Sequence, residues 1–151
     1  MLDFYIDADA CPVKELAFQV AKRYGLTVYA VSNTPIVLPK AEWIIPHVVE
    51  KSFDAVDNWI ESKIERFDLC LTNDTLLAEK CIRKGALAIT PRGMILDENT
   101  IGDALAIREL KYDLRQQGAR DLGPKPTGKS HRSQFLSSLD SVINRLRKQA
   151  K

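Results

Sequence analysis

Aspartates stand where the predicted strands of this sequence end. Asp7 and Asp9 follow the first apolar run, Asp74 follows the fourth, and Asp57 lies one turn into the helix before that fourth run. In open α/β sheets the carboxyl ends of the strands form the crevice in which ligands bind. Two carboxylates about 4 Å apart repel each other by roughly 4 kcal/mol at an effective dielectric of about 20. A shared crevice therefore needs protons, a cation or basic partners.

A divalent metal ion is the partner that such a set of acids favours. Carboxylate ligands without a histidine or cysteine companion are typical of Mg²⁺ or Mn²⁺ rather than zinc. We predict a metal site made by Asp7, Asp57 and Asp74, with phosphoryl transfer or hydrolysis as its chemistry. Asp9 would assist these three in catalysis. The alternative is structural: the strand-end aspartates would cap the helices that follow them, and Asp57 would simply be solvated.

Polar and basic residues near the same crevice are candidates for binding a phosphate. Arg92 follows the fifth predicted strand, and its planar guanidinium can donate two parallel hydrogen bonds to a phosphate or stabilise its own loop. Asn33 follows the second strand, where its amide contacts substrate or folds the turn before Pro35. Lys125 and Arg132 belong to a cationic segment that either closes over a phosphate backbone or is a solvated connection.

Apolar periodicity predicts strands that alternate with helices, which is typical of a mainly parallel sheet covered on both faces. Pro46 either restricts the third strand to an edge of the sheet or splits it, because proline cannot donate a ladder hydrogen bond. We expect a three-layer α/β/α sandwich of about five strands with C-terminal helices, and a loop at 118–130. The predicted strands are 2–6, 26–31, 43–49, 68–72 and 86–90, and the predicted helices are 12–24, 54–64, 76 to near 85, 101–117 and 134–147.

Charge is unevenly distributed along the 151 residues, although the net charge is only +2. Residues 1–107 carry 11 basic and 16 acidic side chains, a net −5, whereas residues 108–151 carry 11 and 4, a net +7. We expect one globular domain over 1–151, with the basic segment 118–151 packed on it. Three cysteines without metal or redox spacing, and no apolar run of roughly 20 residues, predict a cytoplasmic protein.

Several motifs together resemble the YaiI/YqxD family of uncharacterised bacterial proteins, over almost the whole chain. The run Asp7-Ala8-Asp9-Ala10-Cys11-Pro12 is similar to the opening signature of that family. Further matches follow in order at Asn33-Thr34-Pro35, Phe53-Asp54 with Asp57-Asn58, Thr72-Asn73-Asp74 with Leu77-Ala78, Pro91-Arg92-Gly93, and Arg132 with Phe135, Leu139 and Asp140.

The family in turn resembles the PIN-like nuclease superfamily, whose members place acids after the first strand, in a middle helix and after the fourth strand. Asp7, Asp57 and Asp74 match those three places. The resemblance implies a PIN-like fold, a metal-dependent ribonuclease-like site, and single-stranded RNA rather than DNA as the partner. Thr72 and Asn73, beside the third acid, are then expected to help bind the substrate. Asp9 has no obvious equivalent in ordinary PIN domains, so its role as ligand or proton carrier stays open.

Two other functions fit the same residues. Asp7 and Asp9 are spaced like the nucleophile and acid of a haloacid-dehalogenase-like phosphatase, which predicts a phospho-aspartate at Asp7. Cys11 disfavours that function, because it stands where such phosphatases usually carry a hydroxyl-bearing residue. A non-catalytic module that binds nucleic acid or protein would use the acids only to bind an ion or stabilise the crevice, and the +7 segment would supply most of its affinity.

Overall fold

A six-stranded sheet forms the centre of the protein in a computed structural model that describes residues 2–9, 11–52, 54–117 and 129–150. The strand order is β3-β2-β1-β4-β5-β6, and all neighbouring pairs are parallel except β5 with β6. The order therefore reverses between β1 and β4, which makes this the switch point where open α/β sheets bind ligands. The strands are β1 Asp3–Asp7, β2 Thr27–Ser32, β3 Ile44–Val48, β4 Leu69–Leu71, β5 Leu87–Ile89 and β6 Ile95–Leu96.

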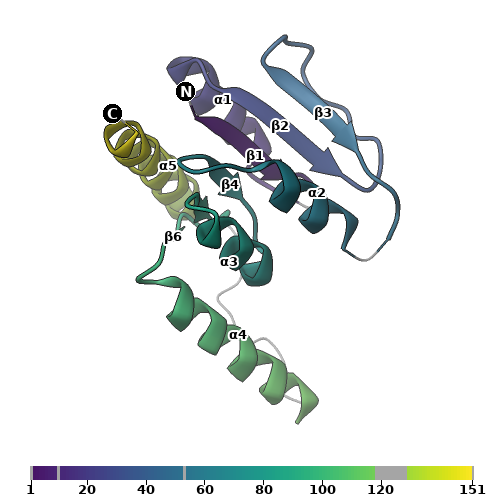
Figure 1. Ribbon diagram of the computed structural model, residues 1–151, viewed down its shortest axis with the longest axis vertical. Coiled ribbons are helices and arrows are strands. Elements are labelled where there is room, and N and C mark those ends of the chain that lie inside the picture. The colour runs from purple at the N-terminus through teal and green to yellow at the C-terminus, as the bar shows by residue number, and fades with distance from the viewer. Residues whose placement is uncertain (1, 10, 53, 118–128, 151) are drawn as a thin grey trace.

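Helices cover both faces of this sheet (Figure 1). Helices α1 (Lys14–Tyr24) and α5 (Lys129–Gln149) pack on one face, and α2 (Ala55–Lys63) and α3 (Thr75–Arg83) pack on the other. Each face has its own cluster of buried apolar side chains, because side chains along a strand point alternately to the two faces. The expected three-layer α/β/α sandwich is confirmed.

The C-terminal helix α5 is part of the core. Asp140 ties it to α1, since its carboxylate accepts hydrogen bonds from Arg23, at 3.0 Å, and from the Tyr24 hydroxyl. The predicted apolar face of the helix is confirmed, because its five side chains are fully buried: Phe135, Leu139, Val142, Ile143 and Leu146.

Two features differ from the sequence-based expectation. The sheet has a sixth strand, β6, which pairs antiparallel with β5 and is only two residues long, too short for a periodic pattern to reveal. Helix α5 begins at Lys129, so the predicted loop ends earlier than residue 130 and the helix starts before residue 134. The rest of that loop, 118–128, lies outside the described residues. Pro46 does lie in an edge strand, as predicted.

Helix α4 (Ile101–Gln116) projects from one end of the molecule (Figure 1). Ile101 and Ala104, near its start, pack partly buried against a small apolar cluster beside α3 and β6. Beyond this contact most side chains of the helix are exposed: Ile107 and Tyr112, for example, are 50% and 59% exposed. None of the described helices is both long and apolar enough to cross a membrane.

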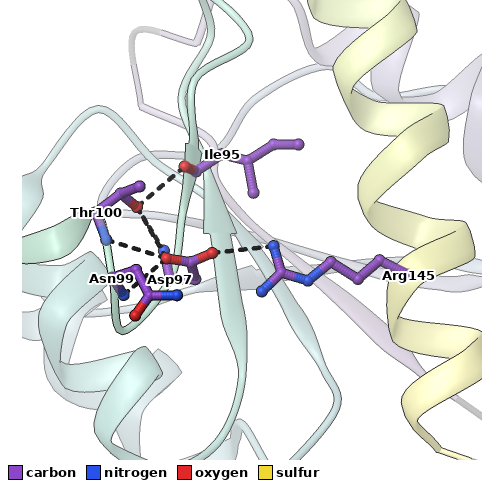
Figure 2. Close-up of polar contacts among 5 residues, drawn as sticks. All are labelled: Ile95, Asp97, Asn99, Thr100 and Arg145. Carbon is purple, nitrogen blue, oxygen red and sulfur yellow. Dashed lines mark hydrogen bonds and ion pairs between the residues drawn. The ribbon is translucent and has the colours of Figure 1, made fainter.

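The start of α4 is anchored by Asp97, as Figure 2 shows. One carboxylate oxygen of Asp97 accepts hydrogen bonds from the backbone N–H groups of Asn99, at 2.8 Å, and Thr100, at 3.0 Å. The other oxygen forms a 3.0 Å ion pair with Arg145 of α5. Asp97 therefore connects the first turn of the projecting helix to a helix of the core, which determines the direction in which α4 leaves the body.

Candidate acidic site

Thr72 links the acids of the two strands that flank the switch point. Its side chain is buried, only 2% exposed, directly after β4. The hydroxyl donates a 3.0 Å hydrogen bond to Asp7, the last residue of β1, and accepts a 3.0 Å hydrogen bond from the backbone N–H of Asp74. Asp74 in turn accepts a 2.9 Å hydrogen bond from the backbone N–H of Leu76 and so caps α3, as the structural alternative predicted for this residue.

Asp57 reaches the same place from α2. Its pKa is raised to about 7, and burial is the largest cause. The charge of Asp74, a hydrogen bond between the carboxyl groups of Asp57 and Asp74, and the charge of Asp7 add to this effect. The charge of Lys80 lowers the pKa slightly. A carboxyl group with such a pKa is partly protonated near neutral pH. Asp57 is thus a member of the acidic cluster and not merely a solvated acid in a first turn.

Asp7 titrates in the same range as Asp57. Burial is the main reason why its pKa is raised to about 6, and the charges of Asp9 and Asp74 add to the effect, whereas the hydrogen bond from Thr72 lowers it. The charge of Asp74 therefore lies close enough to raise the pKa values of both Asp7 and Asp57, and the charge of Asp7 raises that of Asp57. Groups with such pKa values can both accept and donate protons near pH 7.

Asp9 is held at the edge of this cluster by the end of β2. Its carboxylate accepts a 2.8 Å hydrogen bond from the backbone N–H of Asn33, whose side-chain amide donates a 3.0 Å hydrogen bond to the carbonyl of Glu50. Asn33 therefore connects the loop after β2 to Asp9 and to the carbonyl of Glu50, and binding of substrate by its amide stays a prediction. Asp9 acts on the cluster through its charge, because it raises the pKa of Asp7.

The donor atoms of the cluster suit a hard divalent cation. They are carboxylate oxygens beside a threonine hydroxyl, the ligand chemistry that Mg²⁺ and Mn²⁺ favour. In the described part of the chain, however, no three Asp, Glu, His or Cys side chains are arranged as a group that could hold a metal ion. Asp57 and Asp74 are in direct contact, whereas Asp7 is bonded to Thr72. The metal ion stays a prediction.

The predicted substrate-binding residues lie in different places. Asn73 and Arg92 line cavities beside the acidic cluster. Thr72 is buried, and its hydroxyl is bonded to Asp7 and to the backbone of Asp74, so its role in binding substrate stays a prediction. Arg132 is exposed on α5 and is not among the side chains that line these cavities. Lys125 lies outside the described residues.

Gly93 explains how the loop that carries Arg92 is placed. Its φ of +91° lies in the left-handed region, and a Cβ atom there would meet the backbone carbonyl oxygen of Gln134 at 2.9 Å. Only glycine fits both the backbone conformation and the close approach of α5. The Pro91-Arg92-Gly93 motif therefore seats the loop after β5 against the C-terminal helix.

Sequence analysis missed the cations that face Asp74 across a neighbouring cavity. A cavity of about 410 Å³ is lined by Asn73 and Asp74 on one side and by Arg108, Lys111 and Arg115 of α4 on the other. The available signal was the spacing of three cations at three and four residues on one predicted helix. That signal was hidden, because those residues were counted only within the net charge of +7 of residues 108–151.

Buried cysteines are not part of this site. Cys11, Cys70 and Cys81 are all buried and form no disulfide, as expected for packed residues. Burial raises the pKa of the Cys11 thiol, although a backbone hydrogen bond and Lys14 act in the opposite direction. Since the thiolate is the reactive form, Cys11 is unsuited to act as a nucleophile.

Fold and site define an α/β protein with a mainly parallel sheet and an acidic cluster at its switch point. A model of the family described as "Uncharacterized BCR, YaiI/YqxD family" matches residues 5–145. The chain belongs to this family, as its motifs predicted. The further likeness to PIN-like nucleases stays a prediction, and no solved structure gave a significant match.

Bacterial relatives resemble the chain along its full length. It is 45% identical to the UPF0178 protein amb2838 of Paramagnetospirillum magneticum over 148 residues, which are 98% of each chain. It is also 45% identical to the UPF0178 protein RC1_2062 of Rhodospirillum centenum, over 98% of this chain and 99% of the relative. A UPF0178 protein of Gluconacetobacter diazotrophicus is 43% identical over 99% of this chain and 97% of the relative.

Proposed function

We propose that this protein is a metal-dependent nuclease that hydrolyses phosphodiester bonds, with RNA as its substrate. The observation that carries the proposal is the meeting of Asp7, Asp57 and Asp74 at the switch point of the sheet, with the pKa of Asp7 raised to about 6 and that of Asp57 to about 7. These acids come from β1, from α2 and from the cap of α3. Three acids placed together in this way are under mutual repulsion, which a cation relieves.

The chain's own residues would divide the work as follows. Asp57 and Asp74, in direct contact, would be the main ligands of a divalent ion, with Asp7 as the third. Such an ion supplies an activated water and neutralises charge on the leaving oxygen. The leaving oxygen would take its proton from water, because a bound ion displaces the protons of Asp7 and Asp57. Thr72 holds Asp7 and Asp74 in position, because its hydroxyl is hydrogen-bonded to the carboxylate of Asp7 and to the backbone N–H of Asp74.

The phosphatase alternative requires Asp9 to act as a proton carrier beside a nucleophilic Asp7. The carboxylate of Asp9 instead accepts the 2.8 Å hydrogen bond from the backbone N–H of Asn33. This bond directs the carboxylate of Asp9 toward the loop after β2 and occupies an oxygen that the phosphatase would need for proton transfer. This contact favours the nuclease over the phosphatase.

Cleavage of a fluorophore-labelled single-stranded RNA in the presence of Mn²⁺ tests the proposal. We expect Asp74→Asn and Asp57→Asn to lower the rate at least about a hundredfold, equivalent to roughly 2.7 kcal/mol in the barrier. Asp113→Asn is the matched control, because Asp113 is an exposed acid on α4, and it should cleave as the wild type does. An Asp74→Asn protein that cleaves at the wild-type rate, or a wild type without activity, contradicts the proposal. A phosphorylated Asp7 after incubation with a phosphomonoester would support the phosphatase instead.

A further inference from the structure

A cleft runs between the acidic cluster and the projecting helix α4. The cavity of about 410 Å³ lined by Asp74 and by Arg108, Lys111 and Arg115 adjoins a second cavity of about 380 Å³, which extends to Arg92. The two cavities share six lining residues, so they form one continuous depression: Asn73, Thr75, Ala104, Ile107, Lys111 and Arg115. This depression is termed the α4 cleft.

The side of α4 that lines the cleft is cationic. Successive residues of an α-helix are about 100° apart, so Arg108, Lys111 and Arg115 fall within roughly 60° of one another around the helix axis. The acids Glu109 and Asp113 lie more than about 90° away from this stripe. Over the seven residue steps from Arg108 to Arg115, the stripe is about 10 Å long. The helix therefore separates its charges and turns the positive ones toward Asp74.

These cations are available to a ligand. Arg108 and Arg115 are exposed, Lys111 is half-buried, and none of the three forms an ion pair with a carboxylate in the part of the chain that the structure describes. Tyr112, 59% exposed, lines the same cleft. A basic groove combined with an exposed aromatic ring is the combination by which proteins bind single-stranded nucleic acid, through phosphate contacts and base stacking.

We propose that the α4 cleft binds the sugar-phosphate backbone of a single-stranded nucleic acid. Arg108, Lys111 and Arg115 pair with phosphates, Tyr112 stacks on a base, and the strand runs past Asn73 to the acidic cluster. The placement of the strand beside Asp74 rests on the proposed nuclease function, whereas the binding itself does not. The guanidinium group of an arginine can donate two parallel hydrogen bonds to one phosphate. The ring of Tyr112 offers a flat surface on which a base can stack, and this favours a nucleic acid over an acidic peptide as the ligand.

Binding measured without cleavage tests this assignment. The full chain is titrated into a labelled 12-nucleotide single-stranded RNA, and separately into DNA of the same sequence, with EDTA present to prevent hydrolysis. We expect the triple variant Arg108→Ala/Lys111→Ala/Arg115→Ala to bind at least about tenfold more weakly. The slope of log affinity against log salt concentration should fall by about 2, since each lost phosphate contact on a single strand removes roughly 0.7.

A charge-matched control separates the cleft from general attraction. The triple variant Lys22→Ala/Lys63→Ala/Lys148→Ala removes three exposed cations outside the cleft and should bind within about twofold of the wild type. Tyr112→Ala should weaken binding, whereas Tyr112→Phe, which keeps the ring, should not. Four outcomes would overturn the proposal. The two triple variants could lose affinity equally, or the cleft variant could bind as the wild type does. The wild type could also bind neither nucleic acid, or bind polyglutamate as tightly as RNA.

The outcome for the cleft and the outcome for the nuclease are separable. Loss of binding in the cleft variant, together with a wild type that never cleaves, supports the cleft and contradicts only the nuclease. Cleavage by the wild type that depends on Asp74, with binding unchanged in the cleft variant, contradicts only the cleft. If RNA and DNA bind equally, the α4 cleft recognises the shared phosphate backbone, and preference for RNA must arise elsewhere.

Discussion

The Thr72 hydroxyl donates a 3.0 Å hydrogen bond to Asp7, across the boundary between β4 and β1. The same oxygen accepts the backbone N–H of Asp74 at 3.0 Å. One buried hydroxyl thus holds two acids that are far apart in the sequence. The geometry of the acidic cluster consequently depends on a buried residue that is not itself an acid.

Thr72→Val should raise the pKa of Asp7 further above its present value of about 6, because the hydrogen bond that lowers it is lost. The backbone N–H of Asp74 also loses its acceptor, and we expect a fall of about 1–3 kcal/mol in the free energy of unfolding. Titration of the Asp7 carboxyl carbon by NMR measures the pKa. Thr72→Ser keeps the hydroxyl and should restore both quantities. An unchanged Asp7 titration in the valine variant would show that the bond does not act on Asp7.

Stability without metal should fall as the pH rises through the pKa values of the cluster. Asp7 and Asp57 have raised pKa values in the folded state, so the folded protein binds protons more tightly than the unfolded chain does. Their contribution to the free energy of unfolding is fully present below the unfolded pKa of 3.8 and is lost as the pH passes about 6 to 7. Asp57→Asn removes one ionising group. Its Tm should exceed that of the wild type above pH 7 by about 2 °C after allowance for solvent screening, and the difference should shrink below pH 4.

Asp113→Asn provides the control for this pH dependence, because the exposed Asp113 is not part of the acidic cluster. Its Tm should follow the wild-type curve at every pH. A Tm difference between Asp57→Asn and the wild type that is the same at pH 4 and pH 8 would mean that the charge of Asp57 does not oppose folding.

Mn²⁺ should stabilise the protein more at pH 8 than at pH 5. At the lower pH, the ion must displace protons from Asp7 and Asp57, whose pKa values are about 6 and 7. At a hundred times the dissociation constant, binding adds about 2.7 kcal/mol to the free energy of unfolding. Thermal unfolding with and without Mn²⁺ measures this. The increase should disappear in Asp74→Asn, and an increase of equal size in that variant would place the ion elsewhere.

Asp97→Ala should weaken the attachment of α4. Although burial opposes the effect, hydrogen bonds from Arg145 and from the backbone of Asn99 and Thr100 lower the pKa of Asp97. Its stabilisation is therefore present above pH 3.8 and is lost as the pH falls through the lowered value. We expect a loss of about 1–2 kcal/mol from Asp97→Ala. Arg145→Ala, which removes only a partly exposed ion pair, should cost at most about 1 kcal/mol.

Hydrogen exchange distinguishes local loosening of α4 from a general loss of stability. In Asp97→Ala the amides of α4 should exchange faster at neutral pH, while those of β1 keep their protection relative to global unfolding. Uniform acceleration throughout the described chain would show that Asp97 supports the whole fold rather than the start of α4.

Gly93→Ala should destabilise the protein by about 1–3 kcal/mol. The new Cβ would lie 2.9 Å from the carbonyl oxygen of Gln134, in a backbone with φ +91° that alanine rarely adopts. Gly102→Ala is the matched control, because a Cβ atom there meets nothing within 4 Å. That change lies in the first turn of α4 and should leave the urea midpoint unchanged or raise it. Equal urea midpoints for the two variants would show that the close approach of α5 does not exclude a side chain at position 93.

The sequence by itself determined the layered fold and the edge of the sheet at which the acids gather. Strand and helix periods are local properties, and in a parallel sheet the carboxyl ends of neighbouring strands meet at one edge. The positions of Asp7 and Asp74 after two strands were therefore enough to predict their proximity. The buried face of α5 followed in the same way, since its apolar residues recur at helical spacing.

Tertiary structure alone decided what surrounds these acids. The antiparallel pairing of β6, the bond between Thr72 and Asp7, and the contact of Asp9 with Asn33 join residues that no local pattern connects. The direction of α4 is set by the contact of Asp97 with α5. This direction turns toward Asp74 the cations that sequence analysis counted only within the net charge of residues 108–151. Charge can be counted along a chain, but the surface on which it acts depends on how the helices pack.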